Sequence, residues 1–330
     1  MALRNSVTPC HLGNTPFRFG LVVSEFDLAA GGRGSYTLPG YFIEQLQRGV
    51  IRMNEHLTGL IAAPHTAMHV DGSLNLDMIE KQAQCLIDNG VKAVFVCGST
   101  GEGISLSTPE RVQVAERWKD VVGDGLAIIV QAGHHSLVEA KALAEHAQNK
   151  IGARAIASLA PSYFKPRRLE ELILFCAEVA SAAPDTPFYY YHQPGFSGVS
   201  LPIPEFLRIA GKRIPNLAGL KYSDGDLMDF GQCLDFAGGR FDILFGVDEA
   251  LLGALALGAR GAIGSTYNFA APLFHEIVRA FEAGDMASAQ AGQKRARELV
   301  AVLIEFGGLT AIKAVMKVIG IDCGPRRLPL

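Results

Sequence analysis

The chain has 330 residues, 49% hydrophobic content and a formal net charge of -3, so it can bury the core of one large domain or two ordinary ones. The nearly balanced charge, without lysine- or arginine-rich runs, argues against nucleic-acid binding. No apolar run reaches the roughly 20 residues that a bilayer span needs, so we expect a soluble protein. The 6 cysteines are scattered and include no Cys-x-x-Cys pair, which favours a reducing, cytoplasmic location.

Residues 1–52 mix glycine, proline and serine without a sustained hydrophobic period, so we expect an irregular N-terminal extension that lies outside the core. No acidic residue precedes Glu25, which faintly resembles an organelle transit peptide. A simpler interpretation is a start codon assigned too early, because Met53 lies just ahead of the first convincing strand. A disordered extension and an incorrect start both remain open.

From residue 57 onward, short apolar runs alternate with helical patterns. The expected strands are 57–63, 91–97, 126–131, 154–159, 187–191, 217–221, 241–245 and 261–263. About eight strand-then-helix units over roughly 220 residues match a (β/α)8 barrel better than an open doubly wound sheet. We therefore expect an α/β protein with a barrel over residues 53–284.

Helix signals fall between these strands. Residues 74–89 have helical spacing and end at Gly90, and Thr108 is predicted to cap a helix whose first turn holds Pro109 and Glu110. After the eighth unit, residues 286–306 and 309–319 predict two added helices, so residues 285–330 form a C-terminal helical extension.

Lys221 ends the apolar run LAGL, where a buried parallel strand gives way to its loop. Active sites of α/β barrels lie at the carboxyl ends of the strands. A lysine partly desolvated there loses its proton more easily and becomes an amine nucleophile. The alternative is a lysine that reaches out to solvent, which is the commoner case.

Polar groups follow several other strands. The sequence GSTGE at residues 98–102 offers small residues and two hydroxyls that could bind a carboxylate, or could simply start a helix. Three consecutive tyrosines at 189–191 must alternate in direction, and only Tyr191 lies late enough in its strand to reach a pocket. His192 could be a base or ligand, although a loop histidine with a backbone partner is the simpler interpretation. Asp248 and Glu249 suit a polyol, or are first-turn acids of a helix.

No metal or cofactor site is expected. The histidines form no His-Glu-x-x-His motif, and Gly98, Gly101 and Gly103 have the order GxxGxG, which is not the dinucleotide fingerprint. A Walker A lysine is also absent from the sequence.

Five motifs together resemble one family. They are GSTGEG from Gly98, YYYHQPGFSG from Tyr189, GLKYSDGDL from Gly219, FGVDE from Phe245 and GAIGSTYN from Gly261. From residue 57 to the C-terminus the chain is similar to the dihydrodipicolinate synthase and N-acetylneuraminate lyase family of pyruvate-dependent class I aldolases. The resemblance implies a barrel with C-terminal helices, a homotetramer and a reaction without metal or organic cofactor.

The resemblance also implies roles for individual residues. Lys221 would form a Schiff base with a keto acid, and Tyr191 would move the proton of the C4 hydroxyl. The implied substrate-binding residues are Ser99 and Thr100 for the pyruvyl carboxylate and Ser223, Gly246, Asp248, Glu249 and Ser265 for the sugar end. Tyr163 matches a tyrosine near a subunit contact in many relatives and is a candidate proton relay.

The motif after the tyrosines departs from the family pattern. Phe196 stands where dihydrodipicolinate synthases have an arginine for a second carboxylate, which argues against that activity. Gln193, Gly195 and Phe196 also replace the apolar set usual in the lyases, so the exact sugar acid stays open. The expected reaction is reversible cleavage of N-acetylneuraminate to N-acetylmannosamine and pyruvate. The alternatives are an aldolase for another 2-keto sugar acid and a non-catalytic sugar-acid sensor.

Overall fold

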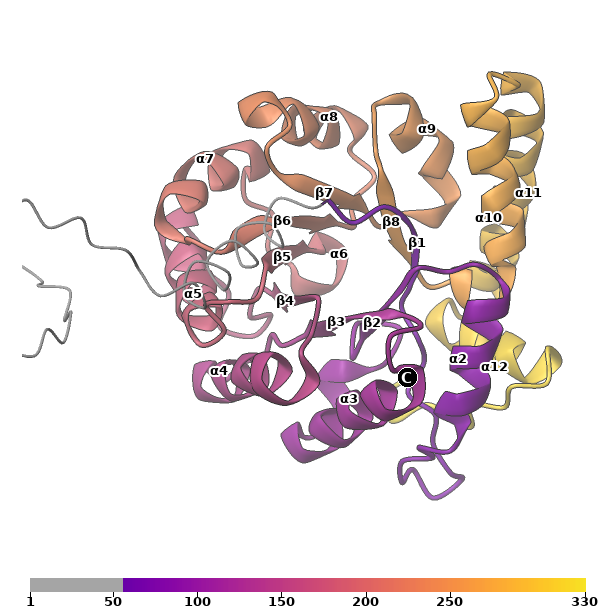
Figure 1. Cartoon of the computed structure of the whole chain (residues 1–330), viewed down its shortest axis with the longest axis horizontal. Helices are drawn as coiled ribbons and strands as arrows, with labels where there is room; N and C mark the ends of the chain where they lie inside the picture. The colour runs from indigo at the N-terminus through magenta and orange to yellow at the C-terminus, as the bar shows by residue number, and fades with distance from the viewer. Residues whose placement is uncertain (1–55) are drawn as a thin grey trace, which may run out of the picture. The chain divides into compact units, whose positions relative to one another are not determined.

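The computed structural model describes residues 56–330, and the expectation for residues 1–52 falls outside this range. Within it, eight parallel strands form a closed barrel in chain order, with β1 hydrogen-bonded to both β2 and β8 (Figure 1). The strands are β1 (Gly59–Ala62), β2 (Ala93–Val96), β3 (Ala127–Gln131), β4 (Ala155–Leu159), β5 (Phe188–His192), β6 (Leu217–Tyr222), β7 (Asp242–Phe245) and β8 (Gly261–Gly264). The predicted (β/α)8 barrel is confirmed.

Helices follow the strands and surround the barrel. They are α2 (Met78–Asp88), α3 (Thr108–Val122), α4 (Leu137–His146), α5 (Leu169–Ser181), α6 (Pro194–Ser197), α7 (Ile203–Arg213), α8 (Leu227–Asp235), α9 (Leu251–Ala256) and α10 (Tyr267–Glu282). The predicted cap of α3 was wrong by one residue. Ser107 is the N-cap: its hydroxyl accepts from the Glu110 amide, and the Glu110 carboxylate accepts from the Ser107 amide. The helix expected from residue 74 begins later, because Leu74 pairs with Met68 in an antiparallel bridge.

Alternation along the strands separates two apolar clusters. Tyr189 and Tyr191 belong to the cluster inside the barrel, whereas Tyr190 packs outward against Phe206 of α7 with ring centroids 4.8 Å apart. The predicted alternation of the three tyrosines is therefore confirmed. It leaves Tyr191, near the carboxyl end of β5, as the tyrosine that can reach a pocket.

A buried carboxylate closes the amino end of the barrel. Asp242, the first residue of β7, accepts hydrogen bonds from the Leu57 amide and from the Tyr189 hydroxyl, both at 2.8 Å. Burial raises the pKa of Asp242, and these two donors oppose that rise. In α/β barrels the substrate binds at the opposite end, where the carboxyl ends of the strands lie.

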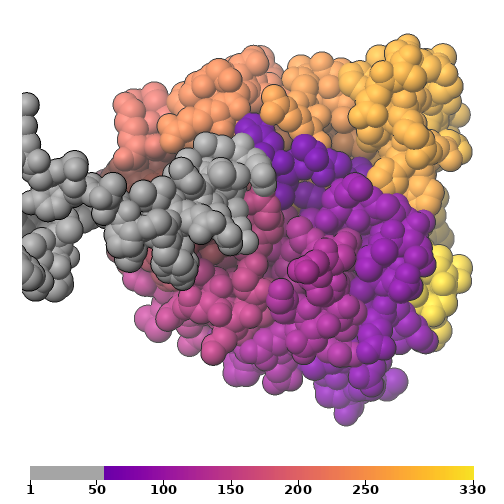
Figure 2. Space-filling view, in the orientation of Figure 1, coloured from indigo at the N-terminus to yellow at the C-terminus, as the bar shows by residue number. Residues whose placement is uncertain are grey.

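Two further helices, α11 (Met286–Glu305) and α12 (Leu309–Val318), follow the barrel as predicted. The residues after α12 return to the first βα unit, where the Met68 amide donates to the Cys323 carbonyl at 3.0 Å. In Figure 2 the yellow C-terminal region at the right edge lies beside the purple surface. No single helix among residues 56–330 is long and apolar enough to cross a bilayer; α11 and α12 pass that test only together, and they are bent by 109°.

Candidate active site

Lys221 points into the barrel. It is the fifth of six residues in β6, it is only 4% exposed, and its strand register sets it beside Tyr191 of β5. Its Nζ lies 4.1 Å from the ring centroid of Phe95 and 4.0 Å from that of Tyr191. The amine is thus buried between two aromatic faces and does not reach out to solvent.

Tyr191 links the amine to the loop after β2. Its hydroxyl is 3.2 Å from Ser99 Oγ, and its ring meets Phe95 edge to face at 5.4 Å. Thr100, next to Ser99, is buried as well. The structure therefore brings together an amine, a phenol and the hydroxyl-bearing loop, as the positions at three strand ends suggested.

The loop that carries Ser99 and Thr100 is tightly wound. Cys97 and Glu102 both have left-handed backbone angles, with φ of 58° and 55°. The Glu102 amide donates to the Ser99 carbonyl at 3.1 Å. A Cβ on Gly103 would lie 1.8 Å from the Cys97 carbonyl oxygen, so only glycine fits there. Glycine is required at position 103 because the backbone of Cys97 lies so close to it.

Ser223 and Gly246 lie together at the ends of β6 and β7. The Ser223 amide donates to the His192 carbonyl at 2.8 Å, and a Cβ on Gly246 would come within 2.1 Å of Ser223 Oγ. Glycine at position 246 therefore leaves room for the serine side chain.

Asp248 joins the loops after β7 and β8. Its carboxylate accepts from the amide and the hydroxyl of Thr266, at 3.0 and 2.6 Å. Burial raises its pKa, whereas Thr266 and the nearby Lys221 lower it. Asp248 and Glu249 begin a short 3₁₀ helix ahead of α9, so both are also first-turn acids. Burial raises the pKa of Glu249, and Ser265 lies half-buried beside this loop.

The position of His192 differs from the simpler interpretation of the sequence, and Tyr163 lies at the surface. His192 is the last residue of β5 and not a loop residue, and its Nε2 is 3.7 Å from an Asp224 carboxylate oxygen rather than bound to the backbone. Burial lowers the pKa of His192 to about 4. Tyr163 is 79% exposed, and its ring packs against Phe164, edge to face at 5.0 Å. Within one chain, Tyr163 stands apart from the other candidate site residues.

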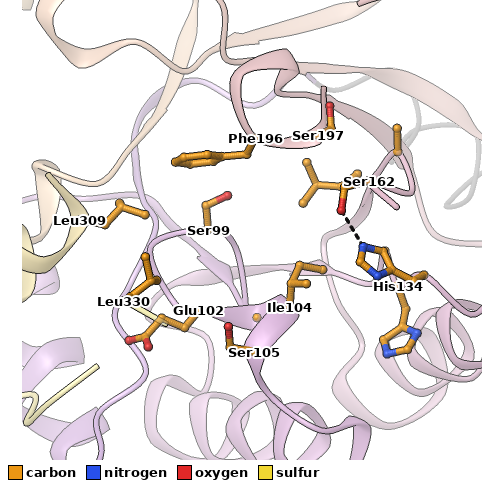
Figure 3. Close-up of a pocket in the computed structure, with 15 residues that line it drawn as sticks. Ser99, Glu102, Ile104, Ser105, His134, Ser162, Phe196, Ser197, Leu309 and Leu330 are labelled. Carbon is orange, nitrogen blue, oxygen red and sulfur yellow. Dashed lines mark hydrogen bonds between the residues drawn. The ribbon is translucent and has the colours of Figure 1, made fainter. Parts of the chain in front are cut away.

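A cavity of about 220 Å³ opens next to Ser99 (Figure 3). Its lining includes residues that the sequence reasoning did not assign to the site: Ile104, His134, His135, Ser162, Leu309 and Leu330. His135 Nε2 and Ser162 Oγ are 2.8 Å apart across its rim. The position of the two histidines just after the third strand could have placed them here. Phe196, which stands where dihydrodipicolinate synthases have an arginine, also lines the cavity.

Comparison with known proteins supports the family resemblance that the sequence motifs indicated. The model of the dihydrodipicolinate synthetase family matches residues 56–330. The chain belongs to this family.

Several relatives at about 45% identity are N-acetylneuraminate lyases. The N-acetylneuraminate lyase of Rattus norvegicus is 46% identical over 279 residues, covering 83% of this chain and 87% of the relative. That of Homo sapiens is 45% identical with the same coverage. Among solved structures, the Proteus mirabilis N-acetylneuraminate lyase is 42% identical and covers 84% of this chain and 93% of its own, with a TM-score of 0.81. The sialic acid aldolase of Aliivibrio salmonicida is 47% identical and covers 84% and 91%, also with a TM-score of 0.81.

Proposed function

We propose that this chain is a class I aldolase that cleaves N-acetylneuraminate reversibly to N-acetylmannosamine and pyruvate. The observation that carries the proposal is the buried Nζ of Lys221, held 4.0 Å from the ring of a tyrosine whose hydroxyl contacts Ser99. The lyase name shared by relatives at about 45% identity supports the same reaction.

Lys221 performs the covalent step. Its neutral amine adds to C2 of the open-chain keto acid, and water leaves to give a cationic imine. Tyr191 gives its phenol proton to the hydroxide that leaves C2, and the resulting phenolate accepts the C4 hydroxyl proton as the C3–C4 bond breaks and its electron pair moves toward the imine nitrogen. N-acetylmannosamine departs as the aldehyde. The remaining enamine takes a proton at C3, and water hydrolyses the imine to free pyruvate and the lysine. No step requires a metal or an organic cofactor.

Two sets of polar residues around the amine bind opposite ends of the substrate. Ser99 and Thr100 bind the carboxylate, because both offer hydroxyl and amide donors and the Ser99 hydroxyl lies 3.2 Å from the Tyr191 phenol. The polyol end extends toward the opposite side, where we place the five residues Ser223, Gly246, Asp248, Glu249 and Ser265. Each sugar hydroxyl needs a partner there, since an unpaired polar group in a buried site is costly.

Tyr163 and its neighbour Phe164 support a homotetramer. Both rings are largely exposed on one chain, and a symmetric contact between copies would cover them. In that assembly Tyr163 remains a candidate proton relay. We also infer a cytoplasmic location, since Cys85, Cys97, Cys176, Cys233 and Cys323 are free thiols among the described residues.

Reduction with borohydride in the presence of pyruvate tests the proposal. We expect a pyruvyl adduct on Lys221, confirmed by peptide mass, and no adduct in Lys221→Met. Lys141→Met is the matched control, because Lys141 is a surface lysine paired with Glu178. A protein that stays unmodified and active after this treatment would falsify the Schiff-base mechanism.

A panel of 2-keto sugar acids distinguishes the alternatives. Pyruvate release from another acid at higher kcat/KM would assign a different substrate, and saturable binding without turnover would indicate a sensor. Phe196 favours an acceptor without a second carboxylate, because its apolar ring lines the cavity.

A further inference from the structure

Resting on the proposed function, we infer that Glu102 is a positioning residue for the carboxylate-binding loop, and that the C-terminal segment 323–330 is part of the keto-acid site through its contacts with Glu102. The residues concerned form a buried ionic cluster, called here the Glu102 cluster, which consists of Glu102, Lys313, Arg326 and Arg327.

Glu102 connects the cluster to the substrate loop. Its side chain is 0% exposed, and its carboxylate accepts from Lys313 Nζ and from the Arg327 amide, both at 2.9 Å. Its own amide donates to the carbonyl of Ser99. The backbone of Glu102 is left-handed, a conformation that a non-glycine residue keeps only when its surroundings fix it. The carboxylate therefore fixes the same turn that presents the hydroxyls of Ser99 and Thr100.

The C-terminal segment reaches this turn because the first βα loop holds it. A Cβ on Gly324 would lie 1.9 Å from the Met68 carbonyl oxygen, so the two backbones touch. Arg327 donates to the Gly72 carbonyl at 2.8 Å and to the carboxylate of Glu110. Leu330, at the end of the segment, lines the same cavity as Ser99 (Figure 3). A segment more than 200 residues away in sequence thus forms one wall beside the carboxylate site.

The buried part of the cluster carries more positive than negative charge. Lys313 and Arg326 are each 2% exposed, and among the described residues both pair with one buried carboxylate, that of Glu102. Arg326 Nη1 lies 3.8 Å from that carboxylate, and its two terminal nitrogens have no hydrogen-bond partner among the described residues. His65, beside the Thr100 backbone, adds no charge: burial, Arg326 and Lys313 lower its pKa to about 3.

This imbalance favours an anion on the loop above it. A buried excess of one cation is costly in isolation, and a substrate carboxylate bound at Ser99 and Thr100 supplies the opposite charge in a region of low dielectric constant. The cluster therefore contributes to binding of the keto acid and not to binding of the aldehyde.

Lys313→Met tests the inference, with Lys317→Met as the matched control. Both lysines lie on α12 in an ion pair, but Lys317 pairs with Asp322 at the surface. We measure the pyruvate concentration that gives half-maximal borohydride trapping, and the KM of each substrate in the condensation direction. We expect Lys313→Met to raise the pyruvate values about tenfold, with kcat and the KM for N-acetylmannosamine changed less than about threefold. Lys317→Met should match wild type, and Lys313→Arg should recover most of the loss.

Failure of the inference is distinct from failure of the proposed function. No adduct in wild type would refute the Schiff-base reaction itself. An adduct in wild type with unchanged pyruvate dependence in Lys313→Met, or an equal rise in both KM values, would overturn the inference. If Lys313→Met does not fold, Arg326→Leu decides by the same measurement, because it removes a buried cation that has few hydrogen bonds to lose.

Discussion

Replacing Tyr191 by phenylalanine removes one hydroxyl and leaves the ring that packs against Phe95 and Lys221. The expected loss of activity depends on whether the hydroxyl only forms a hydrogen bond or also transfers the proton. The contact between the hydroxyl and Ser99 is 3.2 Å long, beyond the usual O–H···O range, so as a hydrogen bond it is worth at most about 1 kcal/mol, or roughly fivefold. As the group that takes the C4 hydroxyl proton, it is worth about 10²- to 10⁴-fold in kcat.

We therefore expect kcat to fall by about 10²- to 10⁴-fold in Tyr191→Phe, with the free energy of unfolding changed by no more than about 1 kcal/mol. Borohydride trapping with pyruvate should persist, because Lys221 and its aromatic neighbours remain. Steady-state pyruvate release from N-acetylneuraminate measures the first effect, and urea unfolding measures the second.

Tyr190→Phe is the control for this experiment. It removes a hydroxyl from the next residue of the same strand, whose ring packs outward against Phe206. We expect near wild-type kcat from this variant. If Tyr191→Phe also keeps kcat within about fivefold of wild type, the phenol does not transfer the proton and the reasoning fails.

Three further changes test the framework of the site. Gly103→Ala would place a Cβ 1.8 Å from a backbone carbonyl oxygen, so unfolding free energy should drop by about 3 kcal/mol or more and pyruvate trapping should weaken; Gly225→Ala, with open space around it, is the control. Arg327→Met should change acid stability. The pKa of Glu110 is lowered to about 2, chiefly by Arg327, so wild type gains stability above the unfolded pKa near 4.5 and loses it as pH falls toward 2. Urea unfolding from pH 5 to pH 2 should therefore show a steeper loss in wild type than in the variant, and parallel curves would contradict this. Asp242→Leu leaves a buried amide and phenol without their shared acceptor and should cost about 2–6 kcal/mol by thermal or urea unfolding, whereas Asp242→Asn keeps an acceptor and should cost less.

The sequence predicted the barrel because its signals are local. Each strand is a short apolar run, and the three tyrosines alternate as any strand requires, so Tyr191 could be placed inside without coordinates. The proximity of Lys221 and Tyr191 also follows from topology, since consecutive strands of a barrel are neighbours. The helix cap was missed by one residue, although the Ser-x-x-Glu spacing of Ser107 and Glu110 is the sequence signature of a capping box.

The remainder of the site depends on contacts between distant segments. No local pattern indicates that Leu330 lines a cavity beside Ser99, or that the Glu102 carboxylate accepts a hydrogen bond from Lys313. The carboxylate of Asp248 also joins two loops through its hydrogen bonds with Thr266, a role that spacing alone does not reveal.

The two aromatic rings around Lys221 affect the relative stability of the charged and uncharged forms of its nitrogen. An attacking amine must be uncharged, whereas the imine formed from it carries a lasting positive charge. Since the faces of Phe95 and Tyr191 lie about 4 Å from Nζ and attract cations, they stabilise the cationic imine relative to the uncharged amine, as they also stabilise the protonated lysine. The same rings that fill the barrel interior thereby lower the free energy of the species on which carbon–carbon cleavage depends.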